Sequence, residues 1–182
     1  MQDVIIIGCG VTGAACAYRL SRFRLRLTVL EALSDVAGGT TKANSAILHA
    51  GYDPEPDTKM ARLNVEGVRM AEEICAKLDV PYRKTGSLVL AFSEEDRALL
   101  RTLLERGEKN GVAGLRLLSG DEARALEPEL SGEVLEALLA PSAAIVNPWE
   151  YALAMAETAV RNGAELHRSC PVTAITREEE GF

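Results

Sequence analysis

The stretch that decides the fold runs from Asp3 to Arg22 and reads DVIIIGCGVTGAACAYRLSR. It opens with the β-branched run 4–7, which predicts a short, buried strand of a parallel sheet. Three glycines in the pattern G-x-G-x-x-G follow, and the segment after them has the apolar spacing of a helix. A strand that passes through such a turn into a helix is typical of a nucleotide-binding βαβ unit.

Each glycine of this turn has a distinct physical reason to be there. Gly8 allows the tight turn, Gly10 lets the backbone approach a pyrophosphate, and Gly13 lets the helix pack closely on the strand. The N-terminus of the helix offers unpaired N–H groups and a partial positive charge to phosphates. A glycine-rich turn without a ligand is the alternative, and the strand–turn–helix–strand order favours the cofactor site. We therefore expect these cofactor-binding residues: Gly8, Gly10, Val11, Thr12 and Gly13.

A second strand is predicted in LRLTVLEA, residues 25–32, with Glu31 near its end. A carboxylate in this place accepts hydrogen bonds from ribose hydroxyls and repels a 2′-phosphate, which argues against NADP. The glycine pattern and the acid serve NAD and FAD alike, so they leave that choice open.

Composition limits the partners of the chain. The 182 residues carry a net charge of −7, which disfavours nucleic acid as a partner but allows a small anionic substrate held by a local positive field. The cysteines lack metal-binding spacing, so we expect no metal site and reduced thiols at Cys9, Cys16, Cys75 and Cys170.

The opening residues lack the basic region and long apolar core of a signal peptide, and no window is apolar enough to span a membrane. We therefore expect a cytoplasmic protein, and peripheral association with the inner face of a membrane stays open.

The rest of the chain mixes helices and strands. Amphipathic patterns predict helices at 61–78 and after Ser93, where Asp96 completes a capping box, and short helices and strands alternate up to residue 146. A helix with Pro148 in its first turn follows, and strands are predicted at 164–169 and 171–176. The polar turn at 177–181 places Phe182 at the start of a return strand, so we expect the natural chain to continue further.

This order predicts an α/β protein. We expect a nucleotide-binding domain at 1–79, an inserted substrate domain at 80–146, and a return to the first domain at 147–182. The middle part lacks a clear βαβ order, which is why we expect it to form a separate subdomain.

Longer stretches carry a family resemblance. The chain resembles the FAD-dependent D-amino-acid-oxidase-like superfamily in five stretches. These are residues 3–22, VLEA, GTTKANSAILHAGYDPEPDTKMARLNVEG, RKTGSLVLAF and APSAAIVNPWEYALAMAETAVRNGAEL. Within it, the Asn44-Ser45…His49-Ala50-Gly51 segment looks most like glycerol-3-phosphate dehydrogenases of anaerobic type and L-2-hydroxyglutarate dehydrogenases. The resemblance covers essentially the whole chain and marks it as an N-terminal part of such an enzyme.

The resemblance implies a glutathione-reductase-like, Rossmann-like FAD-binding domain with part of an inserted α+β substrate domain. It implies FAD as the cofactor, and it places Thr40 and Thr41 along the pyrophosphate and Ser45 near the flavin. Val172 matches a residue whose backbone contacts the adenine. Further C-terminal segments are expected to complete the FAD domain and to carry the residues that hold the substrate anion.

His49 is the candidate catalytic residue. Oxidation of an alcohol by a flavin needs a base for the hydroxyl proton, and histidine has a suitable pKa. The resemblance places His49 beside the flavin ring, whereas the structural alternative is a buried histidine that fixes its loop by hydrogen bonds. Tyr52, nearby, is open to a role at the flavin or in core packing, and His167 is assigned no role.

The predicted function is oxidation of glycerol 3-phosphate or an L-2-hydroxy acid such as 2-hydroxyglutarate, with hydride transfer to flavin. The alternatives are an amino-acid or amine oxidase of the same superfamily and a non-catalytic dinucleotide-binding module. Quinone, oxygen and a redox partner protein are all open as the electron acceptor.

Overall fold

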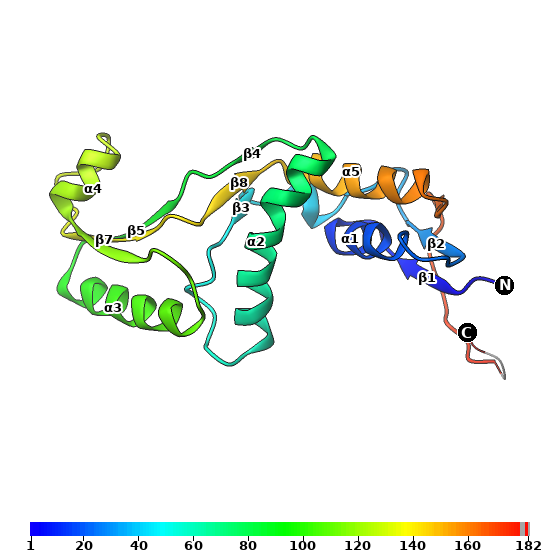
Figure 1. The fold of residues 1–182 in the computed structure, drawn as a ribbon, viewed down its shortest axis with the longest axis horizontal. Coiled ribbons are helices and arrows are strands. Elements are labelled where there is room, and N and C mark those ends of the chain that lie inside the picture. The colour runs from blue at the N-terminus through cyan, green and yellow to red at the C-terminus, as the bar shows by residue number, and fades with distance from the viewer. Residues whose placement is uncertain (179–180, 182) are drawn as a thin grey trace. The chain divides into compact units, whose positions relative to one another are not determined.

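The computed structural model describes residues 1–178 and residue 181, and it divides into two compact units (Figure 1). The first unit comprises Met1–Ala46, Leu78–Val80 and Asn147–Phe182. The second comprises Ile47–Lys77 and Pro81–Val146. The first unit is therefore assembled from three separate stretches of chain, and both stretches of the second unit are inserted between them.

The first unit is built on a parallel sheet with the order β1-β2-β9. Its strands are β1 (Val4–Ile7), β2 (Leu27–Leu30) and β9 (Glu165–His167). Helix α1 (Val11–Leu20) joins β1 to β2, as the sequence predicts. Helix α5 (Pro148–Arg161) packs against α1 through small buried side chains, which allow the two helices to approach closely. These are Ala14 and Ala17 of α1 and Ala152, Ala156 and Ala159 of α5.

The start of α5 follows from its sequence. The Asn147 side chain accepts hydrogen bonds from the N–H groups of Trp149 and Glu150, and Pro148 occupies the first helical position. An asparagine cap and a proline at this position both favour helix initiation, so the predicted boundary is confirmed.

The second unit contains two antiparallel sheets and all of α2 (Lys59–Leu78) except its last residue, which groups with the first unit. One sheet has the order β3-β8-β4, with β3 (Ile47–Leu48), β8 (Ala144–Val146) and β4 (Tyr82–Arg83). The other has the order β5-β7-β6, with β5 (Ser87–Ala91), β7 (Glu136–Ala140) and β6 (Arg116–Ser119).

Helices cover the β5-β7-β6 sheet on two faces. Leu138 of β7 packs with Leu100 and Leu103 of α3 (Glu94–Lys109), whereas the next residue back, Ala137, packs with Ala123 of α4 (Gly120–Leu126). Successive side chains of a strand point to opposite faces, so the two helices lie on opposite sides of the sheet. The predicted capping box of Ser93 and Asp96 is present at the start of α3.

Some features differ from the sequence-based expectations. Residues 171–176 are not a strand: they follow β9 as an exposed segment without regular structure that pairs with none of the described residues. Of the predicted hairpin beyond them, Glu178 and Gly181 form an isolated antiparallel bridge. The predicted return strand at Phe182 lies outside the described residues.

The two units also have bounds other than the expected domains. Residues 47–77 group with 81–146, whereas the sequence analysis assigned everything up to residue 79 to the first domain. The roles of the units as a FAD-binding domain and a substrate domain stay predictions. No helix in the described part of the chain is both long enough and apolar enough to cross a membrane.

Candidate cofactor site and the His49 segment

The glycine turn between β1 and α1 is sterically demanding. Gly8 has a φ angle of +92°, which L side chains rarely adopt, and its N–H donates to the Leu30 carbonyl at 2.8 Å. A Cβ on Gly13 would lie 1.9 Å from the Gly8 carbonyl oxygen, so α1 sits directly on the turn. The structure thus explains why both positions are glycine, while their contact with a cofactor stays a prediction.

The N-terminus of α1 is capped from a distance. Gly10, the N-cap residue, has no side chain to accept a hydrogen bond, and the Val11 N–H donates instead to Thr41 Oγ1 at 2.9 Å. Thr41 belongs to the short 3₁₀ helix η1 (Thr40–Lys42), and a Cβ on Gly10 would lie 3.1 Å from its hydroxyl oxygen. The close approach that Gly10 permits in this structure is therefore that of Thr41.

A groove of about 440 Å³ opens at this helix end. The N–H groups of Thr12 and Gly13 have no hydrogen-bond partner among the described residues, so they stay available to an anion. The Thr41 hydroxyl accepts a bond from Val11 and keeps its own proton for donation. The lining therefore fits a diphosphate. It comprises Ile7, Gly8, Gly10, Val11, Thr12, Gly13, Thr40, Thr41 and Asn44.

Asn44 fixes the backbone of Thr40 and Thr41, two of the residues that line the groove. Its Nδ2 donates to the carbonyls of Thr40 and Thr41, at 3.2 and 2.7 Å, and its Oδ1 accepts from the Ala46 N–H at 2.8 Å. This fixing role of Asn44 was not predicted from the sequence, where Asn44 stands only in the segment that resembles the family. The available signal was an asparagine placed shortly after two threonines, since asparagine side chains readily bond nearby backbone groups.

Glu31 is buried and ties the end of β2 to the glycine turn. Its carboxylate accepts the N–H groups of Cys9 at 2.7 Å and Leu33 at 2.8 Å, one on each oxygen. A carboxylate oxygen has a second acceptor position, so both oxygens can still accept ribose hydroxyls. Burial, and secondarily the Glu31 charge, raise the pKa of the Cys9 thiol to about 11.

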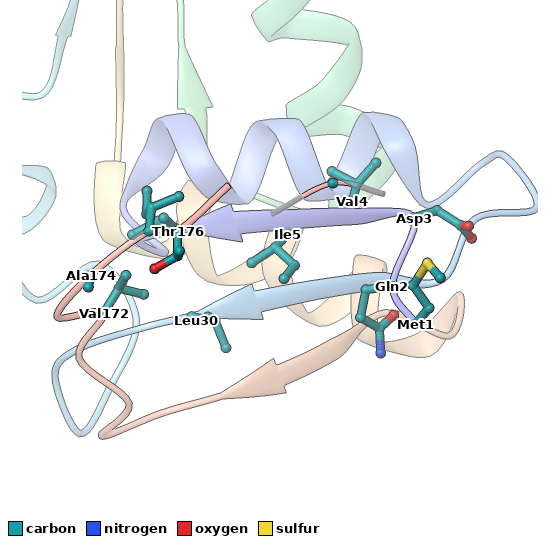
Figure 2. A pocket seen from close by; sticks show the side chains of 12 residues that line it. Met1, Gln2, Asp3, Val4, Ile5, Leu30, Val172, Ala174 and Thr176 are labelled. Carbon is teal, nitrogen blue, oxygen red and sulfur yellow. The ribbon is translucent and has the colours of Figure 1, made fainter. Parts of the chain in front are cut away.

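Val172 lines a different hollow. A cavity of about 610 Å³ lies along β1, where Figure 2 shows Val172, Ala174 and Thr176 beside Ile5. The large apolar side chains Ile5 and Ile7 are 52% and 55% exposed there. Among the described residues, Ile7 is the one that lines both this cavity and the groove at the start of α1, so the two hollows adjoin within the first unit. The contact of Val172 with an adenine stays a prediction.

The remaining predicted residues are accessible. Thr40 and Ser45 are both exposed, and Ser45 makes no hydrogen bond within the described part of the chain. His49 is the first residue after β3, is exposed, and has neither a hydrogen bond nor an ion pair with any described residue. The alternative of a buried histidine that fixes its loop by hydrogen bonds is therefore wrong.

Tyr52 has a packing role. It is half-buried and contacts two apolar clusters of the second unit, one around Ala50 and Val65 and the other around Leu100 and Leu103. His167, at the end of β9, is exposed and lies 3.5 Å from a Glu165 carboxylate oxygen.

Comparisons with known proteins identify the family of the chain. Residues 3–182 match the family model DAO, described as FAD dependent oxidoreductase. The chain is 42% identical over 182 residues, all of its length, to a glycerol 3-phosphate dehydrogenase of Caloramator mitchellensis, and covers 38% of it. It is 35% identical over 182 residues, 99% of its length, to a mitochondrial L-2-hydroxyglutarate dehydrogenase of Pongo abelii, and covers 43% of it.

A solved structure, the dithionite-reduced L-alpha-glycerophosphate oxidase of Mycoplasma pneumoniae with FAD bound, superposes with a TM-score of 0.92 at 30% identity. That match covers 98% of this chain and 47% of the oxidase. The chain thus spans less than half the length of each of these three proteins.

Proposed function

The chain belongs to the DAO family of FAD dependent oxidoreductases, and from that premise we propose that the protein oxidises a small hydroxylated anion. Glycerol 3-phosphate is the first candidate substrate and an L-2-hydroxy acid such as 2-hydroxyglutarate is the second. The observation that carries this proposal is the likeness of the whole chain to a glycerol 3-phosphate dehydrogenase, with L-2-hydroxyglutarate dehydrogenases as further relatives.

FAD is the cofactor of this family. In the proposal its diphosphate lies in the groove at the start of α1, where Thr12 and Gly13 offer N–H groups and Thr41 offers a hydroxyl proton. Glu31 accepts the ribose hydroxyls with the acceptor positions that Cys9 and Leu33 leave free. The open groove, the exposed helix end and the buried acid support this assignment.

The reaction removes two hydrogens from a CH–OH group. Bound FAD supplies the hydride acceptor, since flavins accept hydride at their ring. The chain must supply a group that takes the hydroxyl proton as the carbonyl forms. We assign this proton to a ring nitrogen of His49, because histidine is the side chain that most often serves as a general base. The exposure of His49 and its lack of any partner among the described residues support this role, since a general base must be free to meet its substrate.

The first experiment asks whether the complete protein is a flavoenzyme with this substrate. The purified protein should be yellow with a flavin spectrum, and anaerobic glycerol 3-phosphate should bleach it. Bleaching by L-2-hydroxyglutarate alone would select the second substrate, and bleaching by amino acids alone would select an amine oxidase. Bound flavin that none of these compounds bleaches would overturn the proposal in favour of a non-catalytic module.

The second experiment tests His49 with a matched control. The chain has two histidines, both exposed, so His49→Ala and His167→Ala compare the same change at the two sites. We expect His49→Ala to retain FAD and to lose turnover by about 100-fold or more, as removal of an acid–base residue does. His167→Ala should turn over like wild type. Equal turnover of the flavin-loaded His49→Ala variant would refute the assignment.

The electron acceptor is a further part of the proposal. Oxygen, a quinone and a redox partner protein are candidates, and stopped-flow mixing of the substrate-reduced protein with air or with a water-soluble quinone separates the first two. If neither air nor the quinone reoxidises the reduced protein, a redox partner protein is the remaining candidate acceptor.

A further inference from the structure

The segment that follows His49 is held against α3 by side chains of that helix. Asn110, the C-cap residue that follows α3, donates from Nδ2 to the carbonyl of Gly51 at 2.9 Å and to that of Pro54 at 2.8 Å. Both amide hydrogens of Asn110 are used by these two bonds. Arg106, one turn earlier, donates to the Asp53 carbonyl at 2.8 Å and to the Glu55 carboxylate.

Steric contacts fix the same segment from two sides. Gly107 of α3 is buried, and a Cβ there would lie 2.8 Å from Tyr52 Cβ, so the segment lies directly on the helix. Gly51 has a φ angle of +103°, and a Cβ on it would lie 2.6 Å from a methyl group of Val65 in α2. A glycine inside a helix costs stability, and at Gly107 the close approach of Tyr52 explains why it is tolerated.

The bonds therefore act on a short piece of chain that starts two residues beyond His49. All the residues concerned belong to the second unit. On the other side, His49 is joined to β3, which pairs with β8 through Ile47 and Leu48. The backbone of His49 is thus fixed before it by a sheet and after it by α3, while its side chain is free.

We propose that Asn110 is a positioning residue for the oxidation: its two hydrogen bonds set the path of the chain that leaves His49 and so hold the imidazole where the substrate hydroxyl must meet it. This inference rests on the proposed role of His49. Asn110 touches neither substrate nor cofactor in this scheme, and it acts only through the backbone of residues 51–54. A displacement of a reacting group by about 1 Å can cost about 100-fold in rate, so a loosened segment should act mainly on turnover.

The test uses Asn110→Asp in the complete, flavin-loaded protein. Aspartate has nearly the same shape, but its carboxylate donates no hydrogen bond and faces two carbonyl oxygens. The negative charge that it adds at the C-terminus of a helix is itself unfavourable, so the control must add the same charge at an equivalent helix end. The matched control is Asn162→Asp. Asn162 is the C-cap residue of α5, as Asn110 is of α3, and each is followed by a glycine with positive φ. The Asn162 side chain, however, donates to Ser21 Oγ in the first unit.

Two readouts are measured on each variant: steady-state kinetics with glycerol 3-phosphate, and amide hydrogen exchange of a peptide that spans residues 50–55. In Asn110→Asp we expect faster exchange of this peptide and a kcat lower by about tenfold or more, with KM within about twofold and unchanged flavin content. In Asn162→Asp we expect neither change. A purely structural role of Asn110 would lower flavin content or stability without this split between kcat and KM.

Other outcomes decide as clearly. Wild-type kcat in Asn110→Asp, while His49→Ala is impaired, overturns the positioning role and leaves the proposed function intact. A loss of kcat that is equal in Asn162→Asp also overturns it. Full activity of His49→Ala overturns the proposed base and this inference together. If Asn110→Asp fails to fold, Arg106→Lys loosens the same segment more mildly. Lysine lacks the two-pronged guanidinium group that donates to both Asp53 and Glu55. An unchanged amide exchange rate and an unchanged kcat in Arg106→Lys would count against the proposal.

Discussion

One substitution, Gly→Ala inside a helix, should have opposite effects at two places in this chain. In an exposed helix alanine is more stable than glycine by about 0.5–1 kcal/mol, because glycine loses more backbone entropy on folding. Gly67 is exposed in the middle of α2, and a Cβ there would have no neighbour within 4 Å. We therefore expect Gly67→Ala to stabilise the protein by that amount.

At Gly13 the same methyl group has no room. The added Cβ would lie 1.9 Å from the Gly8 carbonyl oxygen, and such contacts are essentially never shorter than 3.0 Å. The start of α1 or the turn must therefore move by roughly 1 Å, the difference between these two distances. Overpacking of this kind costs about 1–3 kcal/mol, which outweighs the propensity gain of alanine. We expect Gly13→Ala to destabilise the protein by about 1–2 kcal/mol.

The assay is urea unfolding followed by far-UV circular dichroism on wild type and both variants without added cofactor. The free energies of unfolding should differ in opposite directions from wild type, and FAD content after reconstitution should fall only in Gly13→Ala. A Gly13→Ala protein that is as stable as wild type would refute the steric reasoning. A destabilised Gly67→Ala protein would show that the propensity argument does not apply to α2.

Two further predictions concern Thr41 and the buried thiols. Thr41→Val removes the acceptor of the Val11 N–H and the hydroxyl donor at the groove. We therefore expect a loss of about 1 kcal/mol in unfolding free energy and a roughly tenfold weaker FAD affinity. Both are measured against Thr41→Ser, which keeps the hydroxyl. Burial raises the pKa values of the Cys9 and Cys75 thiols from 9.0 to about 11. Between these two pH values the folded protein keeps thiol protons that the unfolded chain releases. The contribution of the two thiols to the free energy of unfolding is therefore complete below pH 9 and is lost as the pH rises to 11. The melting temperature should therefore fall over this range, and less so in a Cys9→Ala, Cys75→Ala variant; an identical fall in both proteins would rule out the thiols as its cause.

Much of this architecture could be predicted because its signals are local. The β1–α1–β2 unit is encoded by a β-branched run, a glycine turn and helical spacing within 30 residues, and the caps of α3 and α5 are encoded by side chains beside the helix ends. Short-range patterns of this kind depend little on the rest of the chain.

The strands that were not predicted correctly depend on pairing partners far apart in the sequence. Strand β3 has two residues, too few to show a period of two, and it exists because Ile47 and Leu48 pair with residues 145 and 144. Residues 171–176 have the composition of a strand, but composition cannot supply the neighbouring strand that a ladder needs, and none of the described residues pairs with them.

The candidate site shows the same division. The glycines and Glu31 were predicted, but the bond from Val11 to Thr41 and those from Asn110 to the His49 segment join residues 30 and more positions apart. A sequence pattern identifies which side chains suit a site, whereas long-range contacts decide which backbone groups they reach.

The parallel sheet of the first unit has a consequence for how the protein is made. Strand β2 is complete at Leu30, but its neighbour β9 begins only at Glu165, after the whole second unit. During translation, one hydrogen-bonding edge of β2 therefore leaves the ribosome without its native partner and stays open while more than 130 further residues are synthesised. Contacts of such long sequence separation form slowly, so we expect the inserted unit to fold before β9 pairs with β2.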